Sequence, residues 1–538
     1  MTANALLVIA TAVQFNGFLR IAFWSIEALA LIWCGARWRI LAATASGIIV
    51  YTISLIAILI KDNTYASSLI SNFVPIWNLR FLAFAVLAVS LWLGSIIIKR
   101  SGLDEAIDFS GIFRVTSWAV ALIILAVEVN DSFKLLISTI SNSTHHIADI
   151  LPHGFFGRIS VSLNYARTMA IGGIWVLYSI PLALFGLKRR ATLLSVLSLI
   201  TLALGAIVIA INGFDFQYIS KFIIGANVRV AAFALLFAGI LVLYHLFSRH
   251  SGEHAWASTA LNILEIAFAA LILELLSLET WTWFERPLLT AKSTAYLAFS
   301  RYMVISIIWS FYSIPVVLYS LRKRSDALLI IGLGSLAAGI AVTASQGFYF
   351  SPIRSFTLLF NIRALAFAMC AFALIAQYML FSRRVTNYVW IPTFLRILQV
   401  ILSLFIFELI TVETIDFFNR MSTLAPQARI INYSANMRQM ILSVVWLIYS
   451  FILISFGFWQ RVRAIRFVAI SLFAVAILKV FISDLSFLDP LYRIFSFAGL
   501  ALILFATSYL YQRYRDLILG VEQSPTSTPQ PPLPDGDT

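Results

Sequence analysis

Long apolar blocks recur along the whole chain, and they constrain its fold more than any other feature. The blocks are about 18–22 residues long, enough for an α-helix to cross the hydrocarbon core of a bilayer. None alternates as a barrel strand does, and within lipid only helices or closed barrels satisfy every backbone hydrogen bond. The sequence therefore predicts an all-α polytopic membrane protein with about 15 transmembrane helices.

The limits of the predicted spans follow the limits of these blocks. We place the spans at residues 5–36, 40–60, 77–98, 112–130, 167–187, 192–212, 227–248, 256–280, 301–321, 327–345, 361–382, 390–414, 438–459, 464–483 and 491–512. An odd number of spans puts the two termini on opposite sides of the membrane.

Positive charge gathers in short clusters at the ends of spans. The 538 residues are 61% hydrophobic and 12% charged, with a formal net charge of +14. The clusters, such as Arg37 with Arg39 and Lys188 with Arg189, follow odd-numbered spans. The positive-inside rule then predicts an inner (cytoplasmic) membrane protein with a periplasmic N-terminus and a cytoplasmic C-terminus. Because no basic domain exists, the charge indicates membrane lipids as partners and no nucleic acid.

Three sequence elements recur at similar spacing, which indicates internal repeats. The first is Trp-x-x-Tyr-Ser, with Trp175, Trp309 and Trp446 matching one another, as do Tyr178, Tyr312 and Tyr449. The second is Asn-x-Arg at the start of a span, with Arg80, Arg229, Arg363 and, in a degenerate copy, Arg493. The third is a glutamate that ends an apolar run: Glu128, Glu279 and Glu413. In two copies an aspartate, Asp131 or Asp416, follows three residues later.

These elements divide the chain into four predicted units. Residues 1–150, 151–290 and 291–425 hold about four spans each, residues 426–516 form a truncated unit of about three spans, and residues 517–538 are a disordered Pro-rich cytoplasmic tail. An even number of spans returns the chain to the same side of the membrane. The units are therefore parallel repeats of a four-helix unit, not inverted ones.

The stretch LKVFISDLSFLDPLYRIFSFAGLALILFATSYLYQRYR, from Leu478 to Arg515, resembles the end of the bacterial family called domain of unknown function 2339. The Trp-x-x-Tyr helix, the Asn-x-Arg-x-x-Ala-Phe-Ala element and the span ending in Glu are also similar to that family, from Trp24 onward. The resemblance implies a multi-span bacterial envelope protein. It supplies neither an activity nor functional residues.

The predicted topology brings the repeated charges to one layer near the outer face. Arginines lying eight residues before the repeated tryptophans join this layer: Arg167, Arg301 and Arg438. One interpretation is structural. Asn caps its helix, the arginines reach the headgroups, and each glutamate pairs with the arginine that opens the next span, which joins neighbouring units. The other interpretation is a ligand-binding pocket lined by these Arg and Glu side chains, because ionisable residues within membranes often mark pathways.

The aromatic element also has two interpretations. Trp and Tyr three residues apart share one helix face, which either packs between units or lines a lumen, and packing is preferred. Pro181 and Pro315 each follow their tryptophan by six residues. Proline usually kinks a span, which occurs in transporters and in ordinary membrane helices alike.

Residue patterns for catalysis or metal binding are weak. His145, Asp149 and His153 have helical spacing, but a nearby proline and their absence from other units argue against a metal site. Cys34 and Cys370 lie far apart in apolar runs, as buried thiols do. Phosphate loops, zinc helices and nucleophile elbows are missing, so no cofactor is expected.

Three functions remain open. The first is binding or transport of an amphipathic or anionic envelope molecule through the periplasmic Arg/Glu layer. The second is a structural or scaffolding envelope protein without a ligand. The third is a membrane-embedded transferase that uses outer-face carboxylates, Glu128 with Asp131 or Glu413 with Asp416. The sequence does not decide whether the chain is an enzyme, although it favours the two non-enzymatic functions, with membrane lipids and other envelope proteins as partners.

Overall fold

The computed structural model of the chain describes residues 2–15, 17–60, 73–101, 108–145, 155–214, 223–250, 256–290, 294–351, 353–383, 389–424 and 428–484, with five positions between 501 and 512. This part of the chain contains 15 α-helices and no strand. The predicted all-α fold class is thereby confirmed.

The helices follow one another through short connections. Their bounds are α1 Thr2–Gln14, α2 Phe18–Trp38, α3 Leu41–Ile60, α4 Leu79–Ser101, α5 Phe109–His145, α6 Phe155–Lys188, α7 Thr192–Gly213, α8 Val228–Arg249, α9 Ala257–Thr290, α10 Ala295–Lys323, α11 Asp326–Gly347, α12 Ile362–Ser382, α13 Ile391–Leu424, α14 Ala428–Trp459 and α15 Arg463–Lys479. A 3₁₀ turn at Ile353–Ser355 precedes α12, and a π-helical turn at Val480–Asp484 follows α15.

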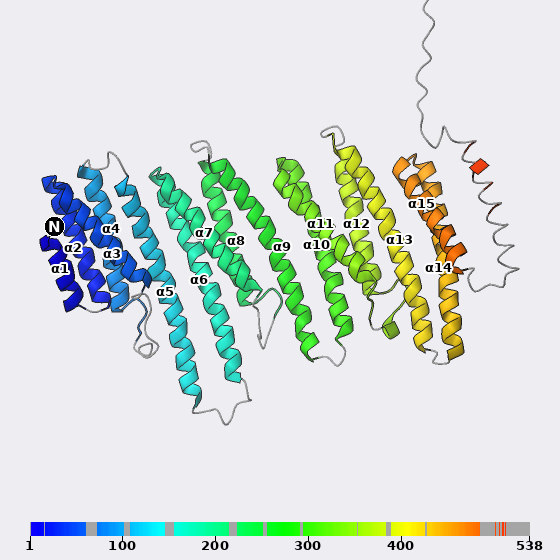
Figure 1. Cartoon of the computed structure of the whole chain (residues 1–538), viewed down its shortest axis with the longest axis horizontal. Helices are drawn as coiled ribbons and strands as arrows, with labels where there is room; N and C mark the ends of the chain where they lie inside the picture. Colours follow the sequence, from blue (N-terminus) through cyan, green and yellow to red (C-terminus); the bar gives the residue numbers. More distant parts are fainter. Residues whose placement is uncertain are drawn as a thin grey trace, which may run out of the picture. The chain divides into compact units, whose positions relative to one another are not determined.

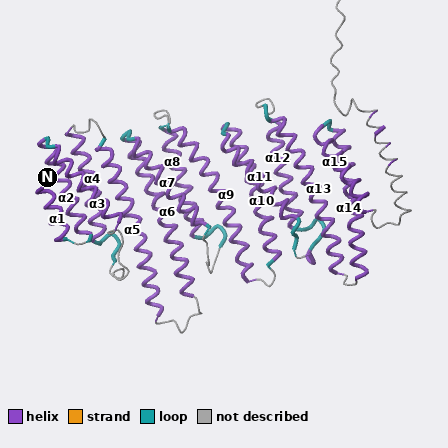
Figure 2. Tube along the Cα trace, in the orientation of Figure 1, coloured by secondary structure: helices purple, strands orange, loops and turns teal. Residues whose placement is uncertain are grey.

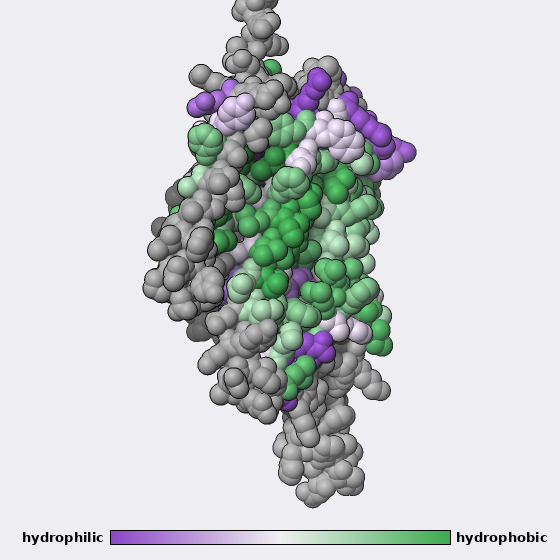
Figure 3. Space-filling model, turned by 90° about the vertical axis from the view of Figure 1, so that its right-hand side faces the viewer, coloured by the Kyte–Doolittle hydropathy of each residue, from purple (hydrophilic) through white to green (hydrophobic). Residues whose placement is uncertain are grey.

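Within the described residues, 14 of these helices, α2 to α15, are long and apolar enough to cross a membrane. Figure 3 shows a broad hydrophobic band on one face, between hydrophilic side chains near the top and near the bottom of the view. A chain with this many apolar helices is a multi-pass membrane protein.

The first predicted span is divided into two helices. The sequence predicts one span over residues 5–36, but α1 ends at Gln14 and α2 begins at Phe18. Gly17 between them has a left-handed backbone with φ 59°, a conformation that glycine adopts readily. With 13 residues, α1 is about 20 Å long, which is too short to cross the hydrocarbon core. The last predicted span, 491–512, lies almost entirely outside the described residues.

The fourth span of each predicted unit continues well beyond its glutamate. The predicted spans 112–130 and 256–280 end close to their glutamates and leave loops after them, yet α5 runs to His145 and α9 to Thr290. In Figure 1 the lower ends of α5 and α6 project past those of α2, α3 and α4. The loop predictions failed because hydropathy marks where a helix leaves the lipid, and the backbone hydrogen bonds of a helix continue equally well in water.

The chain forms two compact parts, Met1–Pro287 with Ser325–Ile331, and Leu288–Arg324 with Gly332–Thr538. In the first part α2 packs against α3 and α4, α4 against α5, and α6 against α5, α7 and α8. In the second part α12 packs against α10 and α13, and α14 against α13 and α15. Within each part these helices run side by side (Figures 1 and 2). The buried core of the first part lies around Leu87 of α4 and Phe233 of α8.

Four helices that contain a repeated tryptophan end in the same way, at an arginine with a left-handed backbone. Arg39, Arg190, Arg324 and Arg461 come 15 residues after Trp24, Trp175, Trp309 and Trp446, and each has a left-handed backbone with φ between 52° and 58°. The backbone N–H after the arginine donates to the carbonyl five residues earlier in three cases, as from Ala191 to Gly186 at 2.8 Å. This hydrogen bond ends the helix as a Schellman motif does. The chain then enters the next helix within a few residues.

Candidate functional site

Arg363, the second residue of α12, is fully buried and lies at the centre of a charged cluster. Its Nε and Nη2 atoms donate to Glu413 Oε1 at 3.0 and 2.9 Å. Its Nη1 atom donates to Asp416 Oδ2 at 2.5 Å and to the carbonyl oxygen of Gly347 at 2.9 Å. The guanidinium therefore joins α12 to the end of α11 and to the middle of α13, with its charge paired as burial requires.

The segment ahead of α12 binds the same glutamate. Asn361 caps the helix, since its Oδ1 accepts from the N–H of Ala364 at 2.9 Å, and its Nδ2 donates to both oxygens of Glu413 at 2.9 and 3.1 Å. The backbone N–H of Leu359 donates to Glu413 Oε2 at 2.8 Å. Leu359 has φ 61°, a left-handed conformation that points this N–H at the carboxylate. Glu413 thus accepts from a guanidinium, an amide and the backbone.

Two further clusters have the same arrangement of residues. In order from the N-terminus, the three are clusters A, B and C. Cluster A comprises Ile76, Asn78, Arg80, Glu128 and Asp131; cluster B comprises Gly225, Asn227, Arg229, Glu279 and Thr282; cluster C comprises Leu359, Asn361, Arg363, Glu413 and Asp416. In each, the arginine and the glutamate are buried, and the first residue has a φ between 61° and 75°.

In cluster A, Arg80 donates to Glu128 Oε1 at 2.8 Å and to Asp131 Oδ2 at 2.5 Å. Asn78 caps α4 through the N–H of Phe81 at 2.8 Å, and the N–H of Ile76 donates to Glu128 at 2.9 Å. The cluster joins α4 to α5, because its first three members come just before or within α4 and its acids from α5.

Cluster B differs at one member. Arg229 Nε donates to Glu279 Oε1 at 3.1 Å, and Gly225 N–H donates to Glu279 Oε2, also at 3.1 Å. At the position three residues after the glutamate, cluster B has Thr282, whose hydroxyl accepts from Arg229 Nη2 at 2.8 Å. A neutral hydroxyl therefore takes the place of the aspartate in clusters A and C.

Each cluster joins the third and fourth spans of a single predicted unit: α4 with α5, α8 with α9, and α12 with α13. The expectation that each glutamate pairs with the arginine opening the next span is wrong for these three pairs. The reason is the length of the fourth helix. Since each glutamate lies inside a continuing helix, its neighbour is the helix packed alongside, and the connection to the next span lies farther along the chain.

The arginines before the repeated tryptophans have varied surroundings. Arg438 Nη1 donates to Asn419 Oδ1 at 2.6 Å, and Asn419 Nδ2 donates to Asp416 Oδ1 at 3.2 Å. Arg438 of α14 is thereby linked to cluster C through one amide. Arg167 lies half-buried in α6, and the Arg301 guanidinium lies 5.3 Å from the Tyr302 ring. In cluster A the additional cation is Lys134, 3.2 Å from Asp131 Oδ1.

Two acidic side chains that the sequence interpretation passed over lie near these clusters. Glu274 and Glu408 come five residues before Glu279 and Glu413, and each has a buried Oε1 atom without a hydrogen-bond partner among the described residues. Glu408 faces the end of α11, where its Oε1 would lie 3.7 Å from a Cβ atom at Gly347. The sequence signal that could have identified each of them is a single glutamate inside an apolar run.

The repeated tyrosines contact the preceding helix through its backbone. Tyr178 of α6 donates its hydroxyl to the carbonyl oxygen of Trp118 in α5 at 2.7 Å, and Tyr449 of α14 donates to that of Ser403 in α13 at 2.6 Å. Trp118 and Ser403 both lie ten residues before the glutamate of their helix. The same contact therefore occurs in both compact parts. Trp309 and Tyr312 lie in α10.

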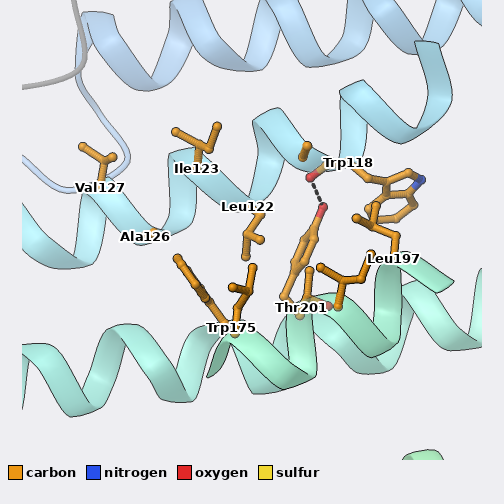
Figure 4. A pocket seen from close by; sticks show the side chains of 12 residues that line it. Trp118, Leu122, Ile123, Ala126, Val127, Trp175, Leu197 and Thr201 are labelled. Atoms are coloured by element: carbon orange, nitrogen blue, oxygen red, sulfur yellow. Dashed lines mark hydrogen bonds between the residues drawn. The ribbon is translucent and has the colours of Figure 1, made fainter. Parts of the chain in front are cut away.

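An apolar pocket of about 410 Å³ lies beside Tyr178, between α5, α6 and α7 (Figure 4). Its wall includes Trp118, Leu122 and Ala126 of α5, with Trp175 of α6 and Thr201 of α7. In Figure 4 the Trp175 ring extends from α6 toward α5. The pocket has no charged residue in its lining, in contrast to the clusters.

Several predicted features fall outside the described residues: Arg493, the side chains of His145, Asp149 and His153, and the tail at 517–538. Among the residues that are described, no group of three or more His, Cys, Asp or Glu side chains is placed to hold a metal ion. Pro181 and Pro315 lie inside α6 and α10, which continue through them.

Residues 338–514, about a third of the chain, match the model of the family described as predicted membrane protein (DUF2339). This match confirms the resemblance over these residues, which include cluster C. No curated protein and no solved structure matches the chain.

Proposed function

We propose that this multi-span membrane protein is a structural or scaffolding protein of the bacterial inner membrane, in which clusters A, B and C hold helices together and bind no ligand. One observation carries the proposal. In every cluster the buried glutamate accepts hydrogen bonds from the arginine, the asparagine and a backbone N–H of that same cluster. The charges that a ligand would need are already paired.

Charge balance supports this role. A buried charge is tolerated only when it is paired and hydrogen-bonded. In cluster A two cations, Arg80 and Lys134, face two acids. Among the described residues of cluster B, one arginine faces one glutamate. Such neutral sets stabilise a single arrangement of two helices. A site for an anionic ligand would instead be expected to hold unpaired positive charge.

We extend the proposal to the organisation of the chain, as four parallel units with a periplasmic N-terminus and a cytoplasmic C-terminus. The support is the recurrence of three arrangements: the left-handed arginine after tryptophan and the Arg–Asn–Glu cluster, both at similar spacing, and the tyrosine contact, which occurs twice. The positive-inside rule supports the orientation.

The two other functions make different demands on the clusters. Binding of an amphipathic or anionic molecule through the Arg/Glu layer requires that a ligand replace Glu128, Glu279 or Glu413 as the partner of arginine. A transferase requires two carboxyl groups able to act on one substrate, whereas Glu128 and Asp131 both bond to Arg80. Each demand costs the energy of opening a buried ion pair.

The test compares Arg363→Ala with the triple variant Arg363→Met, Glu413→Met and Asp416→Leu in the full chain. Removing one partner of a buried set is strongly destabilising, whereas replacing the whole set by apolar residues is often neutral. We expect the single variant to lower the amount of protein in the membrane and the triple variant to restore it. The envelope phenotype of a deletion strain should return with the protein. A triple variant that is abundant but fails to complement would contradict the scaffold and favour a ligand.

A further inference from the structure

We propose that the apolar pocket between α5, α6 and α7 binds a neutral, lipid-soluble carbonyl compound of the quinone class, with the indole N–H of Trp175 donating to its carbonyl oxygen. This inference goes beyond the scaffolding role, and it does not depend on clusters A, B and C.

The first observation is an unused donor. Trp175 Nε1 is buried and has no hydrogen-bond partner among the described residues. The other buried polar groups of the wall are occupied: Tyr178 donates to the carbonyl of Trp118, and Thr201 donates to that of Ser198 at 2.9 Å. A buried donor without an acceptor costs free energy. Because indole nitrogen only donates, the missing partner is an acceptor.

The second observation is how the equivalent contact is built in the other compact part. Trp446 of α14, which matches Trp175, donates its Nε1 proton to Thr411 Oγ1 at 3.0 Å. The Phe407 ring lies 5.0 Å from the Trp446 ring and 5.8 Å from the Tyr449 ring. Thr411 and Phe407 lie two and six residues before Glu413, where α5 has Ala126 and Leu122 before Glu128.

Two smaller side chains therefore distinguish the α5 interface. Ala126 in place of threonine removes the acceptor of the tryptophan, and Leu122 in place of phenylalanine removes a ring. Both residues line the pocket of about 410 Å³, a volume within the range of about 300–1,000 Å³ of small-molecule sites. The α5–α6 interface lacks both the threonine and the phenylalanine of the α13–α14 interface. It is also the one of the two that has the pocket and the tryptophan donor without a partner.

The position of Trp175 along its helix indicates how deep the acceptor must lie. Trp175 follows Arg167 by eight residues and precedes Lys188 by 13 residues, distances of about 12 and about 20 Å along a helix. Together they match the roughly 30 Å of the hydrocarbon core, with both basic residues at its edges. A phospholipid ester lies in the interfacial region, too shallow to reach Trp175. The oxygen therefore belongs to a molecule dissolved in the core itself.

The wall also selects for a neutral molecule with an unsaturated ring. No charged side chain lines the pocket, so a headgroup or carboxylate would be buried without a partner. Three aromatic residues, Trp118, Trp175 and Tyr178, form part of the wall and can contact a planar ring. The aliphatic residues of α5 and α7 suit a hydrocarbon tail.

The test measures binding of decyl-ubiquinone, with decylbenzene as a probe that lacks the carbonyl, to the purified full chain in lipid nanodiscs. Trp175→Phe keeps a ring and removes the donor. We expect it to weaken decyl-ubiquinone binding about three- to tenfold, the effect of one hydrogen bond, and to leave decylbenzene binding unchanged. Equal weakening of both probes, or of neither, would overturn the role of Trp175.

A pair of exchanges tests the pocket itself. Leu122→Phe with Ala126→Thr gives α5 the residues that α13 already carries, so it should fold and abolish binding of decyl-ubiquinone. Phe407→Leu with Thr411→Ala makes the reverse exchange and should create a second binding site. Retention of full binding by the first variant would overturn the proposal. Thermal unfolding of each variant, measured without probe, separates loss of the site from loss of the fold.

Discussion

Clusters B and C have the same arginine, asparagine and glutamate, yet differ in the third acceptor. Cluster C has Asp416, and a further cation, Arg438, reaches it through Asn419. Cluster A likewise has Asp131 with Lys134 beside it. Cluster B has the neutral Thr282, and among the described residues its arginine faces one carboxylate, that of Glu279. The Arg–Asn–Glu set is therefore the constant part of the clusters, and a second acid occurs where a second cation compensates for it.

The largest expected effect comes from removing the arginine. Arg363→Ala leaves Glu413 and Asp416 buried without their guanidinium, and should lower the free energy of unfolding by about 3–5 kcal/mol. Arg229→Ala leaves one acid among the described residues, Glu279, without its guanidinium, and should cost less. Thermal unfolding in a mild detergent measures both variants. Equal losses would mean that the second acid adds nothing to cluster C.

Exchanging the third acceptor between clusters B and C should also destabilise the protein. Asp416→Thr removes the charge that Asn419 and Arg438 approach, and Thr282→Asp adds an acid without an added cation. Each should destabilise the protein by about 1–3 kcal/mol, the cost of leaving a buried polar group without a matching partner. The same unfolding measurement tests them. If Thr282→Asp is neutral or stabilising, the charge-balance explanation is wrong.

The asparagine should have a smaller effect that is similar in both clusters. Asn227→Ala and Asn361→Ala each remove a helix cap, which costs about 0.5–2 kcal/mol. Each variant also removes an amide that donates to the glutamate. Because the two asparagines make the same hydrogen bonds, the midpoints of unfolding should fall by similar amounts. If the two asparagine variants differ in unfolding midpoint by more than the two arginine variants do, the asparagine does not have the same role in clusters B and C.

The smallest effect is expected at the left-handed residue that precedes the asparagine. Leu359→Gly should raise stability slightly, by up to about 1 kcal/mol, because glycine accepts φ 61° without the penalty of a side chain. Gly225→Ala in cluster B should lower stability by a similar amount. The midpoints of unfolding measure both effects. Gly334→Ala, at a site with open space around the glycine, is the control for any general effect of glycine exchange.

The sequence predicts the helical class, most of the spans and the residue types of the clusters, because each depends on local composition and spacing. Asn361 could be assigned as a helix cap from its position alone. The pairing of Arg363 with Glu413 within one predicted unit was missed, since the glutamates were taken to end their helices. The left-handed backbone at Leu359 carries no signal in its residue type. The pocket was also beyond prediction, because it arises from the sizes of Leu122 and Ala126 against a helix distant in sequence.

Glu413 contacts α12 at two levels, the backbone of Leu359 before the helix and the guanidinium of Arg363 inside its first turn. One contact alone would leave the helix free to turn about its axis. Two contacts, on opposite sides of the cap, determine its rotation as well as its depth. In a membrane, where apolar side chains gain little by facing protein rather than lipid, rotation is otherwise weakly determined. The clusters thus determine which face of α4, α8 and α12 packs against the neighbouring helix.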